Sequence, residues 1–140
     1  MKETETGQLM ELLSKSNDIQ SYLKENSDSF IDCTLADALS TLLADKGAAK
    51  PAVIKRSEIN EIYCYQIFAG KRKPSRNTLL CLCVGLTLSV AETQRLLKIA
   101  GLAPLYPKSK RDSVILFGIG NKQSVCDINE SLYRLDEPTL

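Results

Sequence analysis

The sequence of 140 residues predicts an all-α protein, and three observations support this fold class. Apolar residues recur along most of the chain at the three- and four-residue spacing of helices. Residues that cap helix N-termini precede several of these segments, most clearly the pairs Ser89 with Glu92 and Ser124 with Asp127. Glycines such as Gly47 follow the segments, where a left-handed residue would end a helix.

The first 31 residues predict a helical extension. A short apolar face follows Thr6, and Asn17 with Gln20 resembles a capping box that opens a second helix. The segment "SDSFID" then predicts a linker before the main domain.

Two helices and a tight turn are predicted next. Thr34 would open a helix that Gly47 ends, and its apolar positions follow the i, i+3, i+4, i+7 rule. A short helix then runs from about Lys50 to Ser57, with Pro51 in its first turn, where a missing N–H costs nothing. The core positions predicted for the first of these helices are Leu35, Ala38, Leu39, Leu42 and Leu43.

A helix over residues 61–69 follows, because Asn60 is a good N-cap and Gly70 a stop. We expect this helix to pack against the preceding one through a set of inward residues, namely Val53, Ile59, Cys64 and Ile67. Glu61 and Tyr65 are four apart, as are Ile62 and Gln66, so these four would share the outward face.

The rest of the chain predicts four more helices. Ser75, Ser89 and Ser124 open three of them, and a connector with two prolines follows Gly101. The segment "SVILFGIG" fits a helix from Ser109 or a strand, and we favour the helix because no partner strand is visible. The predicted core positions are Leu79, Leu82, Cys83, Leu86, Val90, Leu96, Leu97, Ala100, Val125, Ile128, Leu132 and Leu135.

One more feature of the helix after Ser75 concerns its outer side. Cys81 and Val84 make this side apolar, which indicates that it is covered. The cover would be either the chain's own C-terminal segment or a second subunit.

Charge is segregated along the chain. Residues 1–45 carry three cations and nine carboxylates, whereas residues 46–76 carry eight cations and two carboxylates. Residues 77–140 are nearly balanced, and the whole chain has a net charge of +1. Such segregation is typical of a segment that binds a polyanion. The alternative is that the acidic and basic segments pair with each other.

Several function classes are excluded or disfavoured by composition. The chain has no histidine, which excludes His-based catalysis and most zinc-site patterns. Cys81 and Cys83 would point about 200° apart on a helix, so they are poor partners for one metal. With no acid–base pair visible, we expect no enzyme activity, no cofactor and no metal site.

The cysteine content and the length of the apolar runs indicate the cellular compartment of the protein. Five cysteines, an odd number at irregular spacing, predict reduced, buried thiols rather than a disulfide framework. The longest apolar run, "LLCLCVGLTL", is about half of what spans a bilayer, and the polar start has no signal-peptide pattern. We therefore expect a cytoplasmic protein with no membrane partner.

The outward face of helix 61–69 suits the DNA major groove. Gln66 could pair with adenine, Glu61 could accept from the cytosine amino group, and Ile62 could touch a thymine methyl. Phosphate contacts would come from cations on both sides of this helix, which are Lys50, Lys71, Arg72 and Lys73. The cations would supply affinity and the helix face specificity.

Residues 34–100 resemble the Xre family, the Cro and phage-repressor type of helix-turn-helix domain. The run "GKRKPS", with "TLLCL" and "LSVAE" downstream, carries the resemblance. The other matching positions are Lys50, Val53, Ile59, Asn60, Cys64, Ile67, Leu79, Leu82, Leu86 and Ser89. The resemblance implies a five-helix, lambda-repressor-like domain that binds specific DNA sequences, usually as a homodimer.

By the family's pattern, the DNA-contact positions are Lys50, Asn60, Glu61, Ile62, Tyr65 and Gln66, with Lys71 and Lys73 at phosphate positions. The chain departs from that pattern at Glu58, where glycine is usual, and at Ile54, where a small residue is usual. A left-handed residue with a side chain costs about 1–2 kcal/mol, so a reshaped turn is expected at Glu58.

The sequence thus predicts three parts: a helical extension over 1–31, a DNA-binding domain over 32–103 and a second helical extension over 104–140. The leading function is a transcriptional regulator that binds double-stranded DNA through helix 61–69, as a homodimer. The terminal helices could also bind a protein partner. The alternative function is a protein-interaction adaptor or inhibitor anchored by Glu61, Ile62 and Tyr65.

Overall fold

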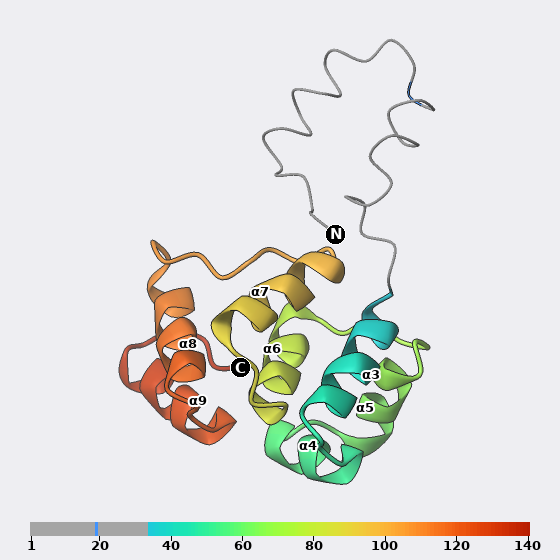
Figure 1. Cartoon of the computed structure of the whole chain (residues 1–140). Helices are drawn as coiled ribbons and strands as arrows, with labels where there is room; N and C mark the ends of the chain where they lie inside the picture. Colours follow the sequence, from blue (N-terminus) through green and yellow to red (C-terminus); the bar gives the residue numbers. More distant parts are fainter. Residues whose placement is uncertain (1–18, 20–33) are drawn as a thin grey trace. The chain divides into compact units, whose positions relative to one another are not determined.

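The computed structural model describes residue 19 and residues 34–140 (Figure 1). The predicted helices after Thr6 and Asn17 fall, apart from residue 19, outside the described residues. The chain divides into two compact units, Met1–Asp32 and Cys33–Leu140, and only the second is considered below. The predicted boundary between residues 103 and 104 lies inside this second unit and stays a prediction.

Residues 34–140 form helices connected by loops and contain no strand, so the all-α prediction is confirmed for this part of the chain. The helices are α3 Leu35–Asp45, α4 Lys50–Ser57, α5 Glu61–Phe68, α6 Arg76–Gly85, α7 Val90–Ile99, α8 Lys110–Gly120 and α9 Val125–Arg134. The segment "SVILFGIG" lies within α8, which settles the choice between helix and strand in favour of helix.

Side-chain caps define where most of these helices begin. The Thr34 hydroxyl accepts a hydrogen bond from the Asp37 N–H, and the Ser75 and Ser109 hydroxyls cap α6 and α8 in the same way. Full capping boxes open α7 and α9, as predicted. Each cap satisfies a backbone donor that the first turn would otherwise leave unpaired.

The helices of this unit lie in three groups (Figure 1). α6 and α7 lie between α3, α4 and α5 on one side and α8 and α9 on the other. α6 is the central helix and packs against α4, α7 and α9. Cys81 and Val84 on its outer side are buried, and α9 packs against this helix, so the chain's own C-terminal helix contributes the predicted cover.

A close approach between α4 and α6 sets the position of α5. A Cβ atom added to Gly85 would lie 2.0 Å from the Ser57 hydroxyl oxygen and 2.7 Å from the Val53 carbonyl oxygen. Only glycine permits this contact, because real Cβ atoms do not approach other atoms so closely. The end of α4, and therefore the turn into α5, rests directly on α6.

Polar contacts attach the C-terminal helices to α6 and to the loop that follows it. Arg76 forms an ion pair with Asp112 of α8, with 2.9 Å between Nη2 and Oδ2. Lys122, in the turn between α8 and α9, donates to the carbonyl oxygens of Thr87 and Leu88 at 3.1 and 3.2 Å. These contacts join segments that are more than 30 residues apart in the sequence.

Two predicted details differ from the structure. The helix predicted over residues 61–69 ends at Phe68, because Ala69 is already the C-cap before the left-handed Gly70. Leu135 was predicted to lie on the apolar side of α9, but α9 ends at Arg134 and Leu135 is exposed. Within the described residues, no helix has the combination of length and apolar content that crossing a bilayer requires.

Candidate nucleic-acid interface

α5 is held by one face and leaves the opposite face open. Cys64, Ile67 and Phe68 are buried, which confirms the two predicted inward positions on this helix. Val53 on α4 is fully buried, and Ile59 is half-buried against the same core. Because residues three and four apart share a helix face, the other positions of α5 turn away from the core, apart from Tyr63, which is half-buried against it.

The outward face of α5 carries the predicted base-contacting residues. Glu61, Ile62 and Tyr65 are exposed, and Ile62 keeps 70% of its surface accessible. Gln66 is half-buried, so it lies at the edge of this face rather than at its centre. Ile62 and Tyr65 therefore place two exposed large apolar side chains on this face.

Asn60 has a structural role that limits its other contacts. Its side-chain oxygen accepts the Tyr63 N–H at 3.0 Å and caps α5, as predicted. The oxygen is therefore occupied, and the side-chain NH₂ group is the part of Asn60 left to contact a phosphate.

The cations around α5 are placed by aromatic rings. The Lys50 ammonium lies 5.5 Å from the centroid of the Phe68 ring, which brings the start of α4 to the end of α5. The Arg72 guanidinium lies 5.7 Å from the centroid of the Tyr63 ring. Both distances are within the range of cation–π attraction. The basic loop over residues 71–73 thus lies along the side of α5.

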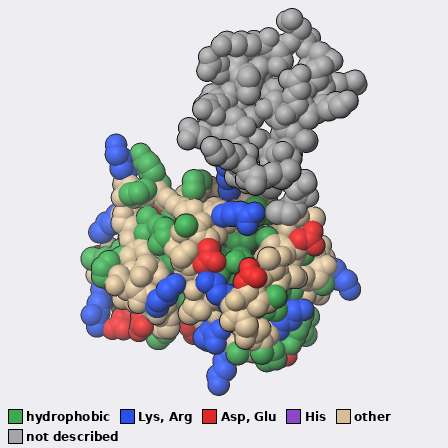
Figure 2. Space-filling view, in the orientation of Figure 1, with side chains coloured by type: hydrophobic (Ala, Val, Ile, Leu, Met, Phe, Trp, Pro, Cys, Tyr) green, Lys and Arg blue, Asp and Glu red, His purple; other side chains and the backbone are tan. Residues whose placement is uncertain are grey.

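These cations are available to an anionic partner. Lys50, Lys71, Arg72 and Lys73 are all exposed, and none forms an ion pair with another described residue. Figure 2 shows basic side chains along the edge of the unit where α4 lies. The structure therefore brings Lys50 and the loop cations to the borders of the outward face of α5.

Sequence reasoning missed some residues that shape this region. Tyr63 supports the basic loop through its ring, but an aromatic residue near cations fits many arrangements and gave no signal. Glu58 was expected to reshape the turn before α5. Instead it takes the left-handed conformation itself, with φ 56° and ψ 34°.

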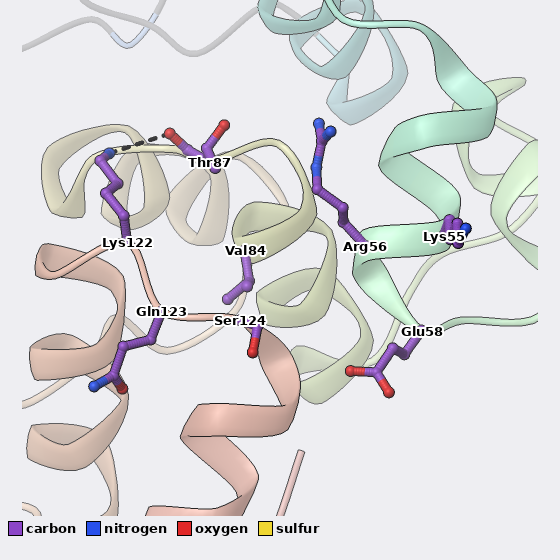
Figure 3. Close-up of a pocket in the computed structure, with 8 residues that line it drawn as sticks. All are labelled: Lys55, Arg56, Glu58, Val84, Thr87, Lys122, Gln123 and Ser124. Carbon is purple, nitrogen blue, oxygen red and sulfur yellow. Dashed lines mark hydrogen bonds between the residues drawn. The ribbon is translucent and has the colours of Figure 1, made fainter.

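A pocket of about 450 Å³ lies beside this region, between the ends of α4 and α6 and the start of α9 (Figure 3). The sequence did not predict it, because its walls come from three separate segments. Its lining residues are Lys55, Arg56, Glu58, Val84, Thr87, Lys122, Gln123 and Ser124.

The thiols were predicted to be buried, and this holds for Cys64, Cys81 and Cys83 but not for Cys126, which is exposed at the start of α9. Cys33 lies outside the described residues. In the part of the chain that the structure describes, no group of three or more potential metal-binding side chains comes together.

Comparisons of this chain with models of protein families, with curated proteins and with solved structures find no match.

Proposed function

We propose that this chain is a sequence-specific DNA-binding protein that regulates transcription. The observation that carries the proposal is the exposed face of α5, bordered by the exposed cations Lys50 and residues 71–73. A protruding helix of this width fits the major groove, and flanking cations fit the phosphates on either side.

The proposed domain is the five-helix, lambda-repressor-like arrangement formed by α3 to α7. Its support is the short α4, the tight turn through Glu58 and the seating of α4 on α6 at Gly85. In this arrangement α4 crosses the backbone and α5 enters the groove. As a homodimer, the protein would bind two half-sites about one helical turn apart.

Each residue of the face has a proposed role. Gln66 pairs with adenine, Glu61 accepts from a cytosine amino group, and Ile62 contacts a thymine methyl. Tyr65 and the Asn60 amide contact the sugar–phosphate backbone beside the groove. The proposed role is binding rather than catalysis, and it requires no cofactor.

The experiment is selection from a random double-stranded DNA library with the full chain, followed by titration of the enriched sequence at several salt concentrations. Lys71→Ala should weaken binding to all sequences and make the logarithmic salt slope shallower by about one unit. Lys98→Ala removes an equal charge on α7 and serves as the control. Gln66→Ala should cost about 1–3 kcal/mol at one base position only.

Failure to enrich any sequence, together with silent Lys71→Ala and Gln66→Ala variants, would contradict the proposal. It would favour a second candidate, a protein-binding adaptor or inhibitor that uses the same face. The observation in favour of that candidate is the 70% exposure of Ile62 beside the exposed Tyr65 ring. Binding through such an apolar surface should change little with salt, whereas DNA binding should weaken steeply.

A further inference from the structure

Tyr63 links α5 to the basic loop over residues 71–73. The loop begins with a backbone contact to α5, in which the Lys71 N–H donates to the Gln66 carbonyl oxygen at 2.9 Å. Farther along the loop, the Tyr63 hydroxyl donates to the Lys73 carbonyl oxygen at 3.5 Å. This second hydrogen bond is long and therefore weak, so the ring of Tyr63 has to be considered as well.

The Tyr63 ring lies beside the middle cation of the loop. The Arg72 guanidinium is 5.7 Å from the ring centroid, within the distance of about 6 Å at which cation–π attraction acts. Tyr63 is half-buried against the core, so the ring belongs to the folded body of the protein. Arg72 remains exposed and forms no ion pair with another described residue. The ring thus restricts where Arg72 lies and leaves its charge available to a partner.

Tyr63 lies at the border of the outward face of α5 rather than within it. With 3.6 residues per turn, Tyr63 is about 40° around the helix axis from Ile67 and about 100° from Ile62. Ile67 is buried and Ile62 is exposed. A side chain at this position supports the groove-binding face from the side, and Arg72 lies between it and the phosphates.

We propose that Tyr63 is a positioning residue of the DNA-binding surface, which holds Arg72 and the basic loop in the arrangement that meets the phosphates and does not contact DNA itself. This inference rests on the proposed DNA-binding function. A loop that is ordered before binding loses less conformational entropy when it binds. Tyr63 therefore contributes to affinity through order, whereas the loop cations contribute through charge.

This role predicts a loss of affinity with no change in salt dependence. Tyr63→Leu keeps an apolar side chain against the core but removes the ring and the hydroxyl. We expect the Kd for the enriched DNA sequence to rise about two- to fivefold, the range that a cation–π contact near the surface supplies. The logarithmic salt slope should stay at the wild-type value, because the number of cations is unchanged, whereas Lys71→Ala makes it shallower. Tyr63→Phe keeps the ring and should retain most of the affinity.

A double-mutant cycle tests whether the contact between the ring and Arg72 is the cause. In an Arg72→Ala background, the effect of Tyr63→Leu on the logarithm of the Kd should fall to less than about half, because the partner of the ring is already absent. An equal effect in both backgrounds would show that Tyr63 acts through the general packing of α5, and would overturn the proposal.

Trypsin digestion of the full chain tests the order of the loop without DNA. Trypsin cleaves after Lys71 and after Arg72, and cleavage of a folded protein follows how often the segment opens. Cleavage after Lys98, which is exposed on α7, reports on opening elsewhere in the same unit. The measured quantity is the rate of loop cleavage relative to cleavage after Lys98, so that a general loss of stability cancels. Tyr63→Leu should raise this ratio about two- to fivefold.

Tyr133→Leu is the matched control for the digestion. It removes a tyrosine ring from α9 that is 78% exposed, and it should leave the ratio of cleavage rates unchanged. A ratio that is the same in the wild type and in Tyr63→Leu would overturn the positioning role, whether or not the protein binds DNA. Faster loop cleavage in Tyr63→Leu, together with a wild type that binds no DNA sequence, would instead contradict the proposed function.

Discussion

At Gly85 the backbones of α4 and α6 come too close for any side chain. A methyl group there would meet the Ser57 hydroxyl and the Val53 carbonyl, both of which are fixed by the hydrogen bond between them. We expect Gly85→Ala to lower the free energy of unfolding by about 3 kcal/mol, because the helices must separate. Urea denaturation followed by circular dichroism measures this loss.

Gly120→Ala is the matched control for that substitution. Gly120 is also the last residue of its helix, and an added Cβ would find its nearest neighbour, Val90, at 3.9 Å. Since alanine favours helix over glycine, this variant should be neutral or slightly more stable. Equal destabilisation of both variants would show that the contact at Gly85 is not the cause.

The buried thiols differ from Cys126 in reactivity. Burial raises the pKa of Cys81 to about 11 and that of Cys83 to about 12. For Cys83 this lowers the thiolate fraction about a thousandfold relative to the ordinary pKa of 9.0. At pH 8 we expect a thiol reagent to leave Cys81 and Cys83 unmodified until the protein unfolds.

Two substitutions test which cysteine reacts rapidly with the reagent. Cys126→Ser should remove one rapidly reacting thiol, because Cys126 is exposed. Cys83→Ala should leave the rapid phase as it was. Rapid modification of Cys83 in the native protein would contradict the burial of α6.

At the scale of elements, the ion pair between Arg76 and Asp112 fixes α8 to the start of α6. Burial of Asp112 favours its protonated form, but hydrogen bonds from Arg76 and from the Tyr106 N–H prevail and lower its pKa below the ordinary 3.8. A carboxyl with a lowered folded-state pKa stabilises the fold above its unfolded-state pKa. This stability is lost as the pH falls through the folded-state value.

Asp112→Asn should therefore lower the free energy of unfolding by about 2 kcal/mol at pH 7, because Arg76 loses its charged partner while half-buried. The difference from the wild type should shrink as the pH falls below 3.8. Denaturation curves of both proteins at several pH values measure this difference in the free energy of unfolding. Glu130→Gln breaks the exposed pair with Arg134 and should cost less than about 0.5 kcal/mol. A cost for Asp112→Asn that does not depend on pH would argue against the charge as its source.

The helices could be predicted from the sequence because the sequence signals that define them are local. A cap such as Ser124 with Asp127 acts within one turn, and the apolar period needs only the helix itself. The same helical spacing of apolar residues predicted the outward face of α5, except that Gln66 is half-buried. The ion pair of Arg76 with Asp112 and the hydrogen bonds of Lys122 could not be predicted, because each joins positions more than 30 residues apart. The pocket could not be predicted for the same reason, because its lining residues come from segments far apart in the sequence.

At the scale of the whole described unit, α8 and α9 share the core of the proposed DNA-binding helices. Their most buried apolar side chains belong to the same cluster as Leu79 and Leu82 of α6. Arg76 and Lys122 add polar contacts across this boundary. A domain that ends at residue 103, as the sequence predicts, would have to fold without them.

We expect a chain truncated after Ala103 to lose its cooperative folding. The deletion removes a set of side chains that are 0–3% exposed, namely Ile115, Ile119, Val125, Ile128 and Leu132. At about 2 kcal/mol for each buried side chain, the loss is on the order of 10 kcal/mol. This is comparable to the whole stability of a domain, which is about 5–15 kcal/mol.

Circular dichroism during thermal unfolding separates the two possibilities. If the core is shared, the truncated chain loses helical signal from α3 to α7 as well as from the deleted helices, and its melting transition disappears. If the predicted boundary is an independent domain limit, residues 1–103 melt cooperatively and retain the signal of α3 to α7. Because Arg76 would lose Asp112 in either case, Asp112→Asn in the full chain is the control that separates loss of the ion pair from loss of the core.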